Sequence, residues 1–183
     1  MYPVRFLLVG LITATVLAFP PTVSAQTPTI PSELLKDWQA QKETMMKIAD
    51  AMPADKFGYK STPAQRSYGE QIMHVVAADQ SVVGMLGGKT PAPAINLKAA
   101  TKAEVMTALR QSMDYWEVVL KEFTDQQLNE RVVTPPSSPL GPSSSRLRLV
   151  YASITHSLDI YGQMVVYLRL NGIVPPASRR GGL

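Results

Sequence analysis

The two histidines of this 183-residue chain are the side chains best suited to bind a metal ion or to move a proton. Each has a carboxylate nearby: Glu70 lies four residues before His74, and Asp159 lies three residues after His156. On helices, these spacings place each acid near the face of its histidine. Two histidines and one carboxylate suit zinc or non-haem iron. The alternative for such an isolated histidine is a core residue that is hydrogen-bonded to a neighbour.

The composition and motifs of the chain exclude several other kinds of functional site. The chain has no cysteine, which excludes disulfides, thiolate metal ligands and cysteine nucleophiles. It has no glycine-rich phosphate loop, no HExxH and no GxSxG motif, and its two histidines suggest no hydrolase triad. The net charge of +4 is too slight for a nucleic-acid surface, and no basic run supports one. We therefore expect no nucleic-acid partner.

The N-terminal 25 residues have the pattern of a signal peptide. Arg5 precedes an apolar run over residues 6–19, and Val23-Ser24-Ala25 forms a small-x-small cleavage site. We predict cleavage after Ala25 and an exported protein, periplasmic or secreted, that is no longer held at the membrane. The run is too short to span a bilayer comfortably, although an uncleaved N-terminal anchor is the alternative.

Residues 26–183 have the length of one domain with its own core. Gln26–Pro31 and Ala177–Leu183 are predicted to be flexible. The segment Arg146–Leu170 predicts one long helix that carries His156, and Asn171-Gly172 ends it. Two of its stripes are predicted to be buried in a bundle, namely Ile154, Leu158, Tyr161, Val165 and Leu168, and His156, Ile160, Gln163, Tyr167 and Leu170.

His74 belongs to a second predicted helix. Ser67 and Glu70 have capping-box spacing, so this helix should run from Tyr68 to about Leu86 and stop at Gly87-Gly88. Small residues near the histidine either leave room for a ligand between helices or let two helices pack closely; they are Ala77, Ala78 and Ser81.

Two further helices complete the predicted fold. Ser32 is a plausible N-cap for a helix over residues 33–52, and a capping box at Thr101 and Glu104 opens one that reaches about Phe123. One or two more helical turns are expected within residues 124–130.

The connections between these helices fix the fold class. Residues 89–100 form a connection long enough for a crossover, which would make the second and third helices parallel. Residues 131–145 are rich in proline and serine and are predicted to be irregular, with Arg131-Val132-Val133 as an isolated β-like run. The sequence thus predicts an all-α four-helix bundle.

Four segments of the chain resemble DinB-like proteins of the DinB/YfiT superfamily. They are Ala51–Phe57, Ser67–His74, His156–Arg169 and Asn171–Pro176, and the resemblance covers essentially all of the mature chain. It implies an up-down-down-up bundle that carries a divalent metal, such as zinc, nickel, manganese or iron, on three histidines. It also implies a possible homodimer.

In this resemblance, His74 matches the first metal ligand and His156 the second, while the third position falls on Ile160. Asp159 or Glu70 could replace the missing ligand, with Gln163 a poorer donor, and the protein would then be a metal-dependent hydrolase or transferase. Otherwise the metal site has decayed, and the protein is a non-catalytic bundle that binds a small molecule or a protein partner. Characterised relatives include transferases and isomerases that use low-molecular-weight thiols as co-substrates. Those thiols belong mainly to the cytosol, so export makes that chemistry less suitable here.

Overall fold

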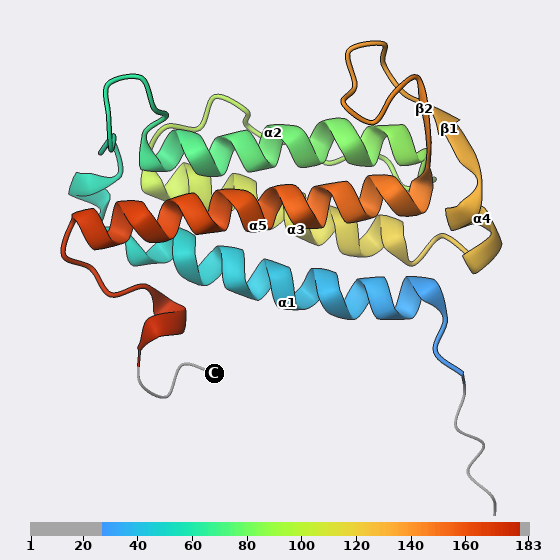
Figure 1. Cartoon of the computed structure of the whole chain (residues 1–183), viewed down its shortest axis with the longest axis horizontal. Coiled ribbons are helices and arrows are strands. Elements are labelled where there is room, and N and C mark those ends of the chain that lie inside the picture. The colour runs from blue at the N-terminus through green and yellow to red at the C-terminus, as the bar shows by residue number, and fades with distance from the viewer. Residues whose placement is uncertain (1–26, 180–183) are drawn as a thin grey trace, which may run out of the picture.

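Four long helices form the bundle in this computed structural model, which describes residues 27–179 (Figure 1). They are α1 (Ile30–Ala51), α2 (Tyr68–Leu86), α3 (Lys102–Leu120) and α5 (Arg146–Leu170). The shorter elements are the 3-10 helix η1 (Ala54–Lys56), the helix α4 (Asp125–Asn129), the strands β1 (Arg131–Val133) and β2 (Ser143–Ser145), and the 3-10 helix η2 (Pro176–Ser178). The predicted signal peptide lies outside the described residues.

Helix starts follow from local capping. The predicted capping boxes at Ser67 and Thr101 are both formed. The start of α1 was predicted wrongly, because its N-cap is Thr29 and Ser32 is the partner that bonds back to the Thr29 N–H at 3.0 Å. Pro31 fits in the first turn, where a helix needs no N–H donor. Ile30 and Pro31 therefore belong to α1 and not to the N-terminal leader.

Side-chain contacts fix the directions of α1 and α3. Trp38 donates from its indole to the Met113 carbonyl at 3.0 Å, while Lys102, at the start of α3, donates to the Asp50 carbonyl near the end of α1 at 2.6 Å. These two helices are therefore antiparallel.

The direction of α2 follows in the same way. Gln80 of α2 donates to Ser112 of α3 at 3.1 Å, and Thr90, just beyond α2, accepts a hydrogen bond from Tyr115 at 2.8 Å. The two helices are thus parallel, as the crossover predicted. Because Arg146, at the start of α5, bonds to the carbonyl at the end of α2, α2 and α5 are antiparallel. The bundle is up-down-down-up.

The core is built around two stacked indoles, Trp38 and Trp116, whose ring centroids lie 4.6 Å apart. Each predicted stripe of α5 is wrong at one leucine, since Leu158 is 47% exposed and Leu170 is 58% exposed. The face that packs into the bundle is instead Ser153, Ser157, Ile160, Met164 and Leu168. Two of these five buried residues are serines, so burial here follows the position on the helix as well as side-chain hydropathy. None of the described helices is long and apolar enough to cross a membrane.

The segment between α4 and α5 is not wholly irregular, which corrects the sequence prediction. β1 pairs antiparallel with β2, with Arg131 opposite Ser145 and Val133 opposite Ser143. The guanidinium of Arg131 also donates to the Ser143 carbonyl at 2.7 Å. Serine has little tendency to form strands, so the partner of the β-like run was not visible in the sequence.

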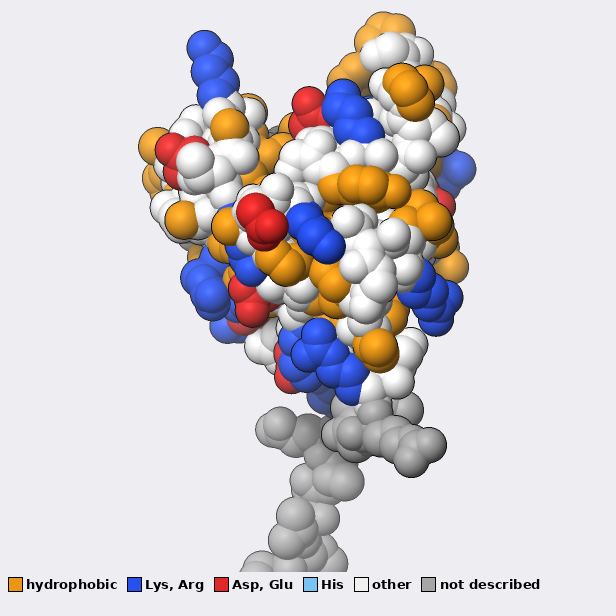
Figure 2. All heavy atoms as spheres, turned by 90° about the vertical axis from the view of Figure 1, so that its left-hand side faces the viewer, with side chains coloured by type: hydrophobic (Ala, Val, Ile, Leu, Met, Phe, Trp, Pro, Cys, Tyr) orange, Lys and Arg blue, Asp and Glu red, His pale blue; other side chains and the backbone are white. Residues whose placement is uncertain are grey.

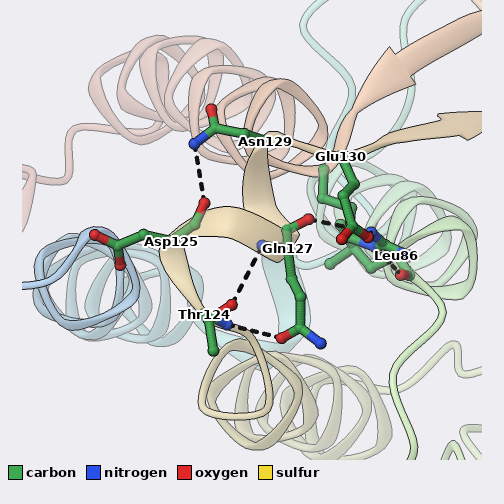
Figure 3. A network of polar contacts seen from close by, with 7 residues as sticks. Leu86, Thr124, Asp125, Gln127, Asn129 and Glu130 are labelled. Atoms are coloured by element: carbon green, nitrogen blue, oxygen red, sulfur yellow. Dashed lines mark hydrogen bonds and ion pairs between the residues drawn. The ribbon is translucent and has the colours of Figure 1, made fainter.

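Arg146 ties three elements together at this end of the bundle. Its Nε donates to the Leu86 carbonyl at 2.8 Å, and another guanidinium nitrogen donates to the Gln127 carbonyl at 3.1 Å and pairs with the Glu130 carboxylate at 2.7 Å. Leu86, Gln127 and Glu130 converge on this point in Figure 3, beside the capped turn of α4 that begins at Thr124. The ends of α2 and α4 are thereby fixed to the start of α5.

Candidate functional site

His74 and His156 meet across the interface between α2 and α5. Their ring centroids lie 4.9 Å apart, with the planes nearly perpendicular at 85°. The antiparallel arrangement of the helices brings together these two residues, which are far apart in the sequence. Nε2 of His156 is buried and has no hydrogen-bond partner in the described part of the chain. A buried polar atom without a partner is costly, so this nitrogen marks a place where a ligand atom or a water would be favoured.

The surroundings of His74 hold its pKa below the ordinary value of 6.5. Desolvation by burial is the largest cause, followed by the positive charge of Arg66 and the proximity of His156. All three disfavour the imidazolium ion. His74 is therefore neutral at neutral pH, with one nitrogen that can donate a hydrogen bond and one that can accept.

Ile160, at the position where the resemblance implied a third histidine, is only 2% exposed and packs in the core. The two carboxylates considered as replacements are engaged elsewhere. Asp159 is exposed and accepts a hydrogen bond from Gln163 at 3.0 Å. Glu70 accepts from the Ser67 N–H at 2.6 Å, and this bond is the main cause that lowers its pKa.

These residues do not complete a metal site of the expected kind. Within residues 27–179, no three side chains of His, Cys, Asp or Glu gather where they could hold a metal ion. The structure brings His74 and His156 together but adds neither Asp159 nor Glu70 to them. Catalytic zinc sites use three protein ligands, so we derive no reaction step through a metal.

A cavity of about 700 Å³ opens beside His74. Its walls come from the linker between α1 and α2, the start of α2, and residues 97–100 of the crossover. Figure 2 faces the end of the bundle where α2 begins and α5 ends, and shows a notch between two projecting lobes with Lys and Arg side chains beside it. The linker is held in place because Phe57 is buried against Tyr68, and Tyr59 contacts Tyr167 edge-on. The volume lies in the range of small-molecule sites.

The sequence reasoning missed a buried acid on α2, five residues after His74. Asp79 of α2 is fully buried, and desolvation raises its pKa well above the ordinary 3.8. Ser153 of α5 faces it and favours the charged form, although neither side chain has a hydrogen bond of ordinary geometry to any of the described residues. A signal was available, since Asp79 occupies a position in the apolar stripe of Ile72, Val76, Val83 and Leu86.

The comparisons with known proteins agree with this architecture. The profile of the DinB family matches residues 23–180, so the chain belongs to the DinB family. This family is generally associated with metal ions. No match was found among curated proteins.

Two solved structures have the same fold. A DinB-like protein from Bacillus cereus ATCC 10987 is 20% identical, with a TM-score of 0.68 over 81% of this chain and 96% of that one. A DinB-like protein from Bacillus subtilis, YjoA, is 15% identical, with a TM-score of 0.60 over 76% of this chain and 92% of that one. At these identities the likeness concerns the fold alone.

Proposed function

We propose that this DinB-family protein is exported and binds a small molecule in the cavity at His74. The observation that carries the proposal is that His74 both lines the cavity and contacts His156, while the position of a third ligand is filled by the buried Ile160. A neutral imidazole in a partly apolar pocket is suited to orienting a ligand by hydrogen bonds.

Two glycines provide a matched test of this proposal. Gly58 lines the cavity, and Gly84 lies on α2 outside the cavity lining; a Cβ added at either position meets nothing within 4 Å. We expect Gly58→Trp to occlude the cavity and Gly84→Trp to leave it open. Protein-observed NMR titration with phenylacetate and phenylacetamide gives the readout.

The expected result is that at least one of the two probes shifts the signals of Met73, His74 and Ala99 in the wild type and in Gly84→Trp, and that Gly58→Trp abolishes these shifts. Met73 and Ala99 line the cavity together with the histidine. Failure of both probes to perturb these residues, or equal binding to both tryptophan variants, would refute cavity binding.

A metal-dependent hydrolase or transferase is the second candidate, favoured by the buried, unpartnered Nε2 of His156 beside His74. Elemental analysis of protein purified without a histidine tag, with titration by zinc, nickel and manganese, distinguishes the two. Near-stoichiometric metal that is lost in His74→Ala and in His156→Ala supports the second candidate. Metal at background level supports the first.

Export is tested separately from ligand binding. The full chain is expressed in a Gram-negative host, and the periplasmic fraction is analysed by intact-mass spectrometry. Cleavage after Ala25 gives a protein that begins at Gln26. A mass that includes Met1, or a product confined to the cytoplasm, would contradict the proposal.

A further inference from the structure

We propose that the cavity at His74 selects a small anion, a carboxylate or a phosphate, that also carries an apolar group. This inference rests on the proposed function, because it names the class of molecule that the same cavity takes. It depends on the charges, the hydrogen-bond donors and the apolar surface around the cavity.

The charge balance of the cavity wall is positive. Lys60, Arg66 and Lys98 line it, against Glu70 as the acid of the lining. Glu70 is already compensated, since it caps α2 through the Ser67 N–H and lies 3.6 Å from the Lys60 ammonium. In the part of the chain that the structure describes, Arg66 and Lys98 make no ion pair and no side-chain hydrogen bond. Two exposed cations are thus free to meet an anion.

Arg66 is the central cation of this set. Its positive charge is felt at His74, where it helps to hold the pKa of the imidazole down. Its backbone is anchored, because the Tyr167 hydroxyl of α5 donates to the Arg66 carbonyl at 2.7 Å. The planar guanidinium offers paired donors that match the two oxygens of a carboxylate or a phosphate. His74, which also lines the cavity, adds one further N–H donor.

Backbone donors at the start of α2 do not compete for this role. The Tyr68 N–H donates to the Tyr59 carbonyl at 3.0 Å, and the Gly69 N–H donates to the Phe57 carbonyl at 3.0 Å. The Glu70 N–H is taken by the Ser67 hydroxyl. Recognition of the anion therefore falls to side chains, and it can be removed by single substitutions.

Another part of the cavity wall is apolar, next to the polar Gln65 and Ser67. This apolar part includes Phe57, Pro63, Met73, Leu97 and Ala99. Leu97 is 54% exposed, although burying a leucine side chain contributes roughly 2 kcal/mol. An apolar group on the ligand would cover this surface, so inorganic phosphate alone would use only part of the site.

The test compares three probes of similar shape: phenylacetate, phenyl phosphate and the neutral phenylacetamide. NMR titration of the full chain, expressed with its N-terminal segment, measures each affinity. We expect both anions to bind about tenfold more tightly than the amide, and Arg66→Gln to remove this preference. Lys98→Gln should act in the same direction with a smaller effect. Arg110→Gln, an exposed arginine of α3 outside the cavity lining, is the control and should change nothing.

The outcomes separate this inference from the proposed function. Equal affinity for the amide and the anions, with binding still abolished by Gly58→Trp, overturns the anion preference and leaves cavity binding intact. No cavity binding by any probe overturns both. An unchanged preference in Arg66→Gln also overturns the inference. A preference for one anion identifies a carboxylate or a phosphate as the natural group.

Discussion

The side chain of Gln71 on α2 donates a hydrogen bond of 2.9 Å to the side chain of Gln163 on α5, on the side of the histidine pair that lies nearer the end of α5. Gln163 in turn donates to Asp159 at 3.0 Å. This chain of bonds fixes the register of the two helices near His74 and His156. It also occupies the carboxylate that would be the most natural substitute for the missing histidine.

Replacing one glutamine of this pair should lower the free energy of unfolding more than replacing both. Gln163→Leu leaves the fully buried Gln71 amide without its acceptor, which is expected to lower the free energy of unfolding by about 1–3 kcal/mol. The double variant with Gln71→Leu removes the unpaired group and should recover part of this loss. Urea denaturation of the single and double variants measures the coupling, and purely additive effects would contradict it.

Replacement of the buried isoleucine should rebuild a metal site. Ile160→His places three histidines where the family arrangement has them, four residues apart on α5 and opposite His74. We expect zinc affinity, measured by calorimetry on tag-free protein, to rise by orders of magnitude. Leu158→His adds a histidine at an exposed position of the same helix and should show no such gain. Similar zinc affinities in the two variants would show that His74 and His156 are not arranged to bind a metal ion.

The buried Asp79 predicts an unusual dependence of stability on pH. Its pKa is raised in the folded protein, so the unfolded chain loses this proton at a lower pH than the folded chain does. The contribution of Asp79 to folding stability is therefore fully present below the unfolded pKa, near 3.8. It is lost as the pH rises from there toward the folded pKa.

Asp79→Asn cannot ionise and should therefore be more stable than the wild type at pH 8, by about 1–3 kcal/mol, with little difference at pH 4. Thermal and urea unfolding across this pH range provide the measurement. Asp37→Asn, at an exposed position of α1, is the matched control. Equal pH profiles for wild type and Asp79→Asn would rule out this role of burial.

Substitution by alanine should change the stability of the protein in opposite directions at two helical glycines. A Cβ at Gly69 would lie 2.8 Å from the Phe57 ring, which holds the linker of the cavity against α2. We expect Gly69→Ala to destabilise the protein by about 1–3 kcal/mol. Gly162 lies in open space on α5, and Gly162→Ala should stabilise by about 0.5–1 kcal/mol. Circular dichroism during thermal unfolding distinguishes the two, and the same sign for both would contradict the packing at Gly69.

Much of the fold could be predicted from local sequence signals. The capping boxes at Ser67 and Thr101 fixed two helix starts, and the long uninterrupted segment before Asn171 predicted α5 in full. The length of the crossover predicted that α2 and α3 run parallel. These features depend on residues close together in the chain, where sequence reasoning is strongest.

The features that were missed depend on distant contacts. The pairing of the β-like run at Val132 with Ser144 joins residues across a loop, and nothing in three serines signals a strand. The cavity arises only when the linker near Arg66 and the crossover near Lys98 reach the same end of the bundle. Asp79 is an acid within an apolar stripe. A single acid matches no metal-binding or capping motif, so its burial was not predicted.

The contacts of Arg146 separate the two ends of the molecule by their tolerance of sequence change. At one end, a single guanidinium joins α2, α4 and the start of α5, so loss of that side chain would loosen three elements at once. At the other end, the linker at residues 57–67 and residues 97–100 of the crossover form much of the cavity wall and carry little of the buried core. The ligand specificity that we propose for the cavity could therefore be changed by exchanging those segments on an unchanged helical scaffold.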